Sequence, residues 1–127
     1  MFLFSVADIP GLVENAHLNK GLGHSFLRHI ERCKSLLYVV DASSEDLTQR
    51  LDILQNELEL YKDGLSSLPS AIVVNKIDII PTKVDNVMKE LEARTGLEVF
   101  PVSGKFQLNT TKLKYSIRSI LERSKLI

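Results

Sequence analysis

The fold of this 127-residue chain is indicated by the stretch Ala71-Ile72-Val73-Val74-Asn75-Lys76-Ile77-Asp78. Its first four residues are apolar, and a group of mostly polar residues follows them directly. A short apolar run bounded by turn-forming residues is typical of a buried strand. Similar runs occur at Phe2 to Ala7, Leu36 to Val40 and Glu98 to Val102, and each precedes a segment of helical period. This alternation predicts an α/β domain with a mostly parallel sheet, whose ligands lie at the carboxyl ends of the strands.

Four helices are predicted around these strands. They are expected from about Gly23 to Cys33, from a cap at Ser43 or Ser44 to Gly64, from Pro81 to Gly96, and from Asn109 or Thr110 onward. The second has the strongest periodicity, with apolar residues spaced by four and three from Leu47 to Leu65. With no repeat and no linker, residues 1–127 are expected to form one domain.

Composition and charge describe an ordinary globular chain. It is 44% hydrophobic and 25% charged with a formal net charge of zero, so the balance does not call for DNA or a membrane as partner. No stretch approaches the roughly 18 apolar residues that a membrane span needs. A local basic patch still permits an RNA contact, and Arg28, Arg32 and Lys34 are one candidate stripe, although a solvated helix end is the simpler interpretation. The single cysteine, Cys33, fits a reducing compartment.

The polar group Asn75-Lys76-Ile77-Asp78 predicts a guanine site. The Asp78 carboxylate can accept hydrogen bonds from N1 and N2 of guanine, a pattern that adenine lacks because its N1 is an acceptor. Asn75 is expected to tie neighbouring loops together, and the Lys76 stem to lie over the purine while its ammonium stays in water. Turns favour these residue types anyway, but their position directly behind a buried strand favours guanine binding.

The stretch Ser103-Gly104-Lys105 follows the last predicted strand and is expected to present backbone N–H groups to the guanine O6 atom. Small residues suit this role because they leave the backbone accessible. Taken alone, the stretch is equally well explained as a turn that ends a strand.

The stretch Asp8-Ile9-Pro10-Gly11 follows the first predicted strand and is expected to act as a switch that senses the third phosphate. Asp8 is placed to hold Mg²⁺ through water, and the Gly11 N–H to approach the terminal phosphate, since glycine has no side chain in the way. A simple Asp-x-Pro-Gly turn is the alternative, and co-occurrence with Asn75 to Asp78 favours the switch.

These motifs carry a specific resemblance. The runs Val6 to His17 and Gly21 to Cys33 resemble the switch segment of the Obg family of GTPases, and Asn75 to Asp78 is similar to that family too. The strings His29 to Cys33 and Tyr61 to Leu65 resemble in particular its mitochondrial members.

The resemblance implies a Ras-like P-loop NTPase G domain with helices on both faces of its sheet. It also implies binding of GTP or GDP with Mg²⁺, GTP hydrolysis in the intact protein, and a role in assembling the large ribosomal subunit. The implied partner is that subunit or its rRNA. The implied location is the mitochondrion, otherwise the cytoplasm.

The chain departs from the family in lacking a Gly-x-x-x-x-Gly-Lys-Ser/Thr phosphate loop. The family's phosphate-loop strand would lie between the strands at Phe2 and Leu36, so we expect a G domain truncated at its amino end that hydrolyses nothing by itself. Gly104 stands where the family usually has alanine. One alternative is a truncated, non-catalytic interaction module that binds partners through Gly21 to Arg32 without nucleotide. Another is an unrelated doubly wound enzyme, for which no catalytic constellation is visible.

Overall fold

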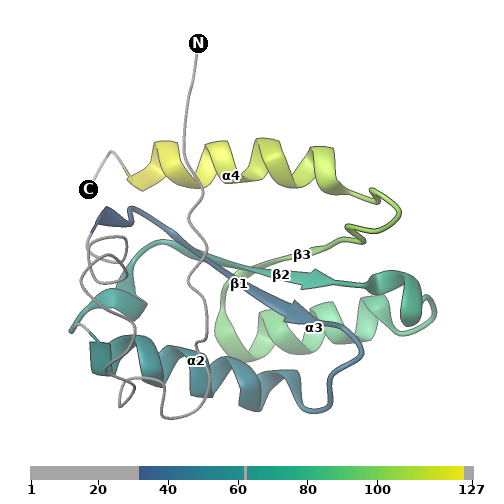
Figure 1. Cartoon of the computed structure of the whole chain (residues 1–127), viewed down its shortest axis with the longest axis horizontal. Helices are drawn as coiled ribbons and strands as arrows, with labels where there is room; N and C mark the ends of the chain where they lie inside the picture. The colour runs from purple at the N-terminus through teal and green to yellow at the C-terminus, as the bar shows by residue number, and fades with distance from the viewer. Residues whose placement is uncertain (1–31, 62, 125–127) are drawn as a thin grey trace.

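A three-stranded parallel sheet lies at the centre of the computed structural model, which describes residues 32–61 and 63–124 (Figure 1). Its strands are β1 (Leu36–Asp41), β2 (Ser70–Asn75) and β3 (Glu98–Pro101), in the order β1-β2-β3. These confirm three predicted strands and their parallel pairing, in which Asp41 lies opposite Asn75 and Ala71 opposite Glu98. The predicted strand Phe2 to Ala7 lies outside the described residues.

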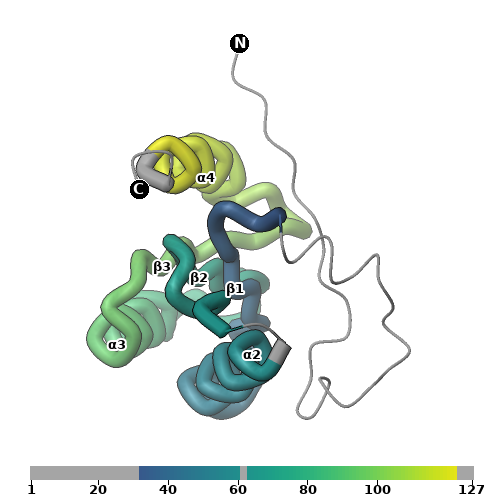
Figure 2. The backbone as a smooth tube through the Cα atoms, turned by 90° about the vertical axis from the view of Figure 1, so that its left-hand side faces the viewer, coloured from purple at the N-terminus to yellow at the C-terminus, as the bar shows by residue number. Residues whose placement is uncertain are grey.

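Helices cover both faces of the sheet. They are α2 (Leu47–Tyr61), α3 (Val84–Thr95) and α4 (Thr110–Ser124), with short 3₁₀ helices η3 (Leu65–Ser67) and η4 (Ile77–Ile79). Figures 1 and 2 show α2 and α3 on one face and α4 alone on the other. Of the predicted helix Gly23 to Cys33, only the last two residues are described. Within the described ranges, no helix combines the length and apolar character that a bilayer crossing requires.

The start of α2 differs from the prediction. The predicted cap at Ser43 or Ser44 is wrong, because the carboxylate of Asp46 accepts hydrogen bonds from the Gln49 N–H at 3.1 Å and the Thr48 hydroxyl at 3.0 Å. Asp46 therefore satisfies one of the backbone N–H donors that the first turn leaves unpaired. Ser43 bonds to an aspartate of the sheet instead, as described below.

The end of α2 also comes earlier than the periodicity suggested. The helix ends at Tyr61, and Gly64 adopts a left-handed backbone with φ of 84°, so that Leu65 enters the core from η3. The Glu59 carboxylate holds this turn by accepting the N–H groups of Gly64 at 3.0 Å and Ser66 at 2.8 Å. By contrast, α3 stops at Gly96 as predicted, with φ of 71°.

The main core lies between the sheet and the pair α2 and α3. Alternate strand residues supply one side of it, and the helices supply leucines. Its members include Tyr38, Val40, Ile72, Val74, Leu51, Leu58 and Leu91. The opposite face of β2 is also covered, since Val73 is 3% exposed and Ile120 of α4 is 3% exposed. Both faces of β2 are buried, which explains why its sequence is a continuous apolar run and not an alternation of apolar and polar residues.

Candidate nucleotide-binding site

The loop after β2 begins with a residue in an uncommon backbone conformation. Lys76 has φ of 66°, in the left-handed region that non-glycine residues rarely occupy. Two hydrogen bonds hold the turn: the Lys76 N–H donates to Asn75 Oδ1 at 2.8 Å, and the Ile77 N–H donates to the Val102 carbonyl at 3.2 Å. The chain therefore turns sharply at the tip of β2 and enters η4 with Asp78 in it.

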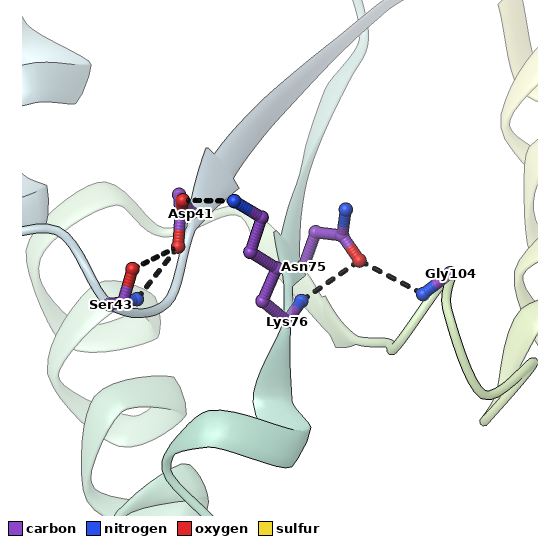
Figure 3. A network of polar contacts seen from close by, with 5 residues as sticks. All are labelled: Asp41, Ser43, Asn75, Lys76 and Gly104. Carbon is purple, nitrogen blue, oxygen red and sulfur yellow. Dashed lines mark hydrogen bonds and ion pairs between the residues drawn. The ribbon is translucent and has the colours of Figure 1, made fainter.

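Asn75 joins the loops that follow β2 and β3. Its Oδ1 also accepts the Gly104 N–H at 3.0 Å (Figure 3). One side-chain oxygen thus binds two backbone donors, one from each loop. Because a lost partner would leave these donors unpaired, the amide of Asn75 fixes the spacing of the two loops.

Asp78 and Ser103 make the second connection between these loops. The Ser103 hydroxyl donates to Asp78 Oδ1 at 2.8 Å, and it accepts the Phe106 N–H at 3.3 Å. Ser103 is fully buried, and its backbone pairs with that of Leu108. Within the described ranges, no donor bonds to the other carboxylate oxygen of Asp78, so this oxygen remains available for a ligand.

The backbone donors of the loop after β3 are mostly used inside the protein. The Ser103 N–H donates to Leu108, the Gly104 N–H to Asn75, and the Phe106 N–H to the Ser103 hydroxyl. The Lys105 N–H has no acceptor among the residues that the structure describes. It is therefore a donor of this loop that remains for a ligand.

Gly104 is not required by space. A Cβ atom added there would lie 3.6 Å from Asn75 Oδ1, an ordinary van der Waals distance. An alanine would fit the same loop, so the departure from alanine at this position leaves the packing around Asn75 unchanged.

Asp41, at the tip of β1, belongs to the same network and was missed in the sequence. Its Oδ2 lies 2.7 Å from Lys76 Nζ, and its Oδ1 accepts the Ser43 N–H at 2.9 Å and the Ser43 hydroxyl at 2.6 Å (Figure 3). The hydrogen bond from Lys76, followed by those from Ser43, holds the pKa of Asp41 well below its usual range. The same contact raises the pKa of Lys76. A carboxylate directly behind a predicted strand was the signal that could have identified Asp41.

Replacing this carboxylate, as in Asp41→Asn, is expected to make the stability of the protein less sensitive to acid. Because its pKa is lowered in the folded protein, ionised Asp41 stabilises the fold above its unfolded pKa of about 4. That contribution is lost as the pH falls through the lower folded pKa. The difference in unfolding free energy between wild type and Asp41→Asn should therefore be constant above about pH 5 and shrink below about pH 4. Urea denaturation as a function of pH measures it.

Asp52→Asn is the matched control for this experiment. The Asp52 carboxylate lies 3.8 Å from Arg94 in a pair whose side chains are both more than half exposed. Such pairs contribute little, so Asp52→Asn should leave the acid dependence as in wild type. A difference for Asp41→Asn that stays constant down to about pH 3 would contradict the assigned role of Asp41.

The structure thus brings together Asn75, Lys76, Asp78, Ser103, Gly104 and Lys105 at the carboxyl ends of β2 and β3. The predicted switch residues Asp8, Ile9, Pro10 and Gly11, with the magnesium position at Asp8, lie outside the described residues. Over residues 32–61 and 63–124, no three His, Cys, Asp or Glu side chains are grouped as metal ligands.

A shallow hollow elsewhere on the surface lies between α3, β3 and the start of α4. It is lined mainly by Met88, Phe100, Pro101 and Leu113. None of the candidate residues lines it, and its lining lacks the carboxylate that would select guanine. The residues predicted to select guanine therefore lie in the loops and not in this hollow.

Comparisons with known proteins identify the family of this chain. A family model described as "50S ribosome-binding GTPase" matches residues 3–76. The chain is 45% identical over 129 residues to the probable GTP-binding protein OBGM, mitochondrial, of Arabidopsis thaliana, covering 95% of this chain and 26% of that protein. It is 48% identical over 99 residues to human mitochondrial ribosome-associated GTPase 2, covering 78% of this chain and 24% of that protein.

A bacterial relative gives the same result. GTPase Obg of Rickettsia bellii (strain RML369-C) is 40% identical over 119 residues, covering 92% of this chain and 36% of that protein. The chain therefore spans between about a quarter and a third of the length of these relatives. The parallel sheet with helices on both faces is the α/β arrangement of a Ras-like G domain, as predicted. On the family match and these relatives, the chain belongs to the 50S ribosome-binding GTPase family and is an Obg-type member of it.

Proposed function

We propose that the loops after β2 and β3 bind the guanine base of GTP and GDP. The proposal rests on two neighbouring groups: a carboxylate with only one of its oxygens hydrogen-bonded, and a backbone N–H group without an acceptor, both judged within the described residues. Asp78 has one oxygen bound by Ser103 and the other available, and the Lys105 N–H has no acceptor in the described part of the chain. Guanine presents donors at N1 and N2 beside an acceptor at O6, which is the complementary pattern. Adenine reverses it, with an acceptor at N1 and a donor at N6.

Lys76 and Asn75 have supporting roles in this proposal. The ammonium of Lys76 is held by Asp41 at 2.7 Å, which restrains the lysine stem at the tips of β1 and β2. A restrained apolar stem is suited to cover one face of a purine. Asn75 keeps the two loops in register through its bond to Gly104.

The phosphate end of the nucleotide is assigned to other residues. Asp8 would hold Mg²⁺ through water, and Ile9, Pro10 and Gly11 would form the loop that senses the terminal phosphate. GTP would supply the phosphoryl group that is transferred to water, and Mg²⁺ would neutralise its developing charge. The residues of the β2 and β3 loops select and hold the base, and GTP hydrolysis is proposed for the intact protein rather than for these 127 residues.

The biological setting is proposed from the relatives. A human relative is named for association with the mitochondrial ribosome, and the plant relative is named mitochondrial. These names support association with a ribosome. We propose that the intact protein acts in assembly of the large ribosomal subunit, with the mitochondrion as its location and the cytoplasm as the alternative.

Titration with fluorescently labelled GDP tests the base-binding proposal. The 127-residue chain is expected to bind the label weakly, and unlabelled GDP should compete while ADP at the same concentration should not. Equal competition by ADP would contradict guanine selection. An absence of binding would contradict the proposal and favour the alternative, an interaction module that acts without nucleotide.

A further inference from the structure

The charge of this neutral chain is concentrated at one end. Residues 102–127 carry six basic residues and one acidic residue, whereas the preceding 101 residues carry ten basic and fifteen acidic ones. The formal charges of the two parts are therefore equal and opposite. A local excess of this size creates a positive field over the surface that holds it, whatever the total charge.

The structure places much of this excess on one outward surface. In Figures 1 and 2, α4 stands alone on its side of the sheet, opposite α2 and α3. Its apolar side is packed inward through Ile120. We call the exposed residues Lys112, Lys114, Tyr115 and Arg118 the basic face of α4. Lys112 lies at its edge, where it also lines the hollow beside β3.

An exposed aromatic ring accompanies cations both on α4 and in the loop before it. Tyr115 is 69% exposed on the basic face, and Phe106 is 58% exposed in the loop that precedes α4. Lys105 Nζ lies 5.4 Å from the centroid of the Phe106 ring. Large aromatic side chains are normally covered in a folded domain, so their exposure beside cations indicates a surface that another molecule covers.

We propose that the basic face of α4, with Lys105 and Phe106, binds single-stranded RNA. This inference rests on the proposed ribosome association and goes beyond the guanine site. Lysine and arginine neutralise backbone phosphates, and exposed aromatic rings stack on unpaired bases. An acidic protein would also account for the cations, and competition by polyglutamate separates it from RNA in the test below.

The ion pair on α4 does not prevent this role. Arg118 Nε lies 3.2 Å from Glu122 Oε1, and both side chains are about half exposed. Exposed pairs at this spacing are weak, so a phosphate can compete for the guanidinium.

Fluorescence anisotropy with a labelled single-stranded RNA of about 20 nucleotides tests the proposal on the full chain. Wild type should bind with an affinity that falls with salt, with a logarithmic slope of about −2 to −3 for three or four phosphate contacts. Lys112→Glu/Lys114→Glu should weaken binding at least about ten-fold. Acidic side chains near the start of a helix stabilise it, so this variant should fold. Circular dichroism checks its helix content.

Lys83→Glu/Lys89→Glu is the matched control. It reverses the same number of exposed lysines, at the start of α3 and within it, on the other side of the sheet. RNA binding should change less than about two-fold.

Phe106→Ala and Tyr115→Ala should each weaken binding about five-fold or more with the salt slope unchanged, because they remove stacking and not charge.

The proposal would be overturned if wild type did not bind RNA at about 50 mM salt, or if the two lysine double variants lost affinity equally. It would also be overturned if the aromatic variants bound RNA like wild type, or if polyglutamate competed as well as RNA. The last two would indicate an acidic protein partner. Asp78→Asn should leave RNA binding unchanged while abolishing competition by GDP. A wrong RNA proposal and a wrong guanine-site proposal therefore give different results.

Discussion

Asp78→Asn is expected to abolish competition by GDP and to create competition by XDP. The asparagine side chain places an NH₂ donor opposite the N2 donor of guanine. Losing the two hydrogen bonds from guanine N1 and N2 to a carboxylate corresponds to at least about 100-fold in affinity. Xanthine has an acceptor at position 2, so its N1 donor and O2 acceptor match an asparagine. The measurement is competition against labelled GDP and labelled XDP by GDP, XDP and ADP.

The fold should survive this substitution. The Ser103 hydroxyl donates to Asp78 Oδ1, and an amide oxygen can accept the same bond. Asp85→Asn is the matched control, since it removes one exposed acid from the first turn of α3 and should leave GDP competition as in wild type. Unchanged GDP competition in Asp78→Asn would remove Asp78 from the base site.

Leu51→Ala is expected to destabilise the domain by about 2–5 kcal/mol, a large fraction of the stability of an ordinary domain. Leu51 of α2 is 1% exposed and belongs to the core between the sheet, α2 and α3. Truncation there removes apolar burial and leaves a cavity that the packed strands cannot fill. Urea denaturation of the two proteins gives the difference in unfolding free energy.

Leu60→Ala provides the control on the same helix. Leu60 is 60% exposed, so the same chemical change should cost less than about 0.5 kcal/mol. Similar losses for Leu51→Ala and Leu60→Ala would show that α2 does not present Leu51 to the core.

The strands and most helix positions were predictable because their signal is local. The apolar runs at Leu36 to Val40 and Ala71 to Val74 became β1 and β2 with one residue more at one end or both. The cap of α2 was not predictable in the same way. Ser43, Ser44 and Asp46 are all good capping residues, and the choice depended on Asp41, which binds Ser43.

The candidate site was predictable in part. Asn75, Asp78 and Ser103 were identified from their positions behind strands, and the structure brings them together. Asp41 was missed because its role depends on a lysine far along the chain, and Lys105 could not be separated from Gly104 because both have an N–H group. The surface proposed for RNA on α4 differs from the stripe at Arg28, Arg32 and Lys34 that the sequence suggested. Arg28 lies outside the described residues, and Arg32 and Lys34 are exposed, so that stripe stays a prediction.

The sequence by itself determined the strand and helix pattern, the family, and the residue types at the loop tips, because hydrophobic period and short motifs are properties of neighbouring residues. Tertiary structure alone decided which of those residues touch. The contacts from Asp41 to Lys76, Asn75 to Gly104 and Asp78 to Ser103 join positions 35, 29 and 25 residues apart. They form only because parallel pairing brings the carboxyl ends of three strands to the same edge of the sheet, and no local pattern records that closeness.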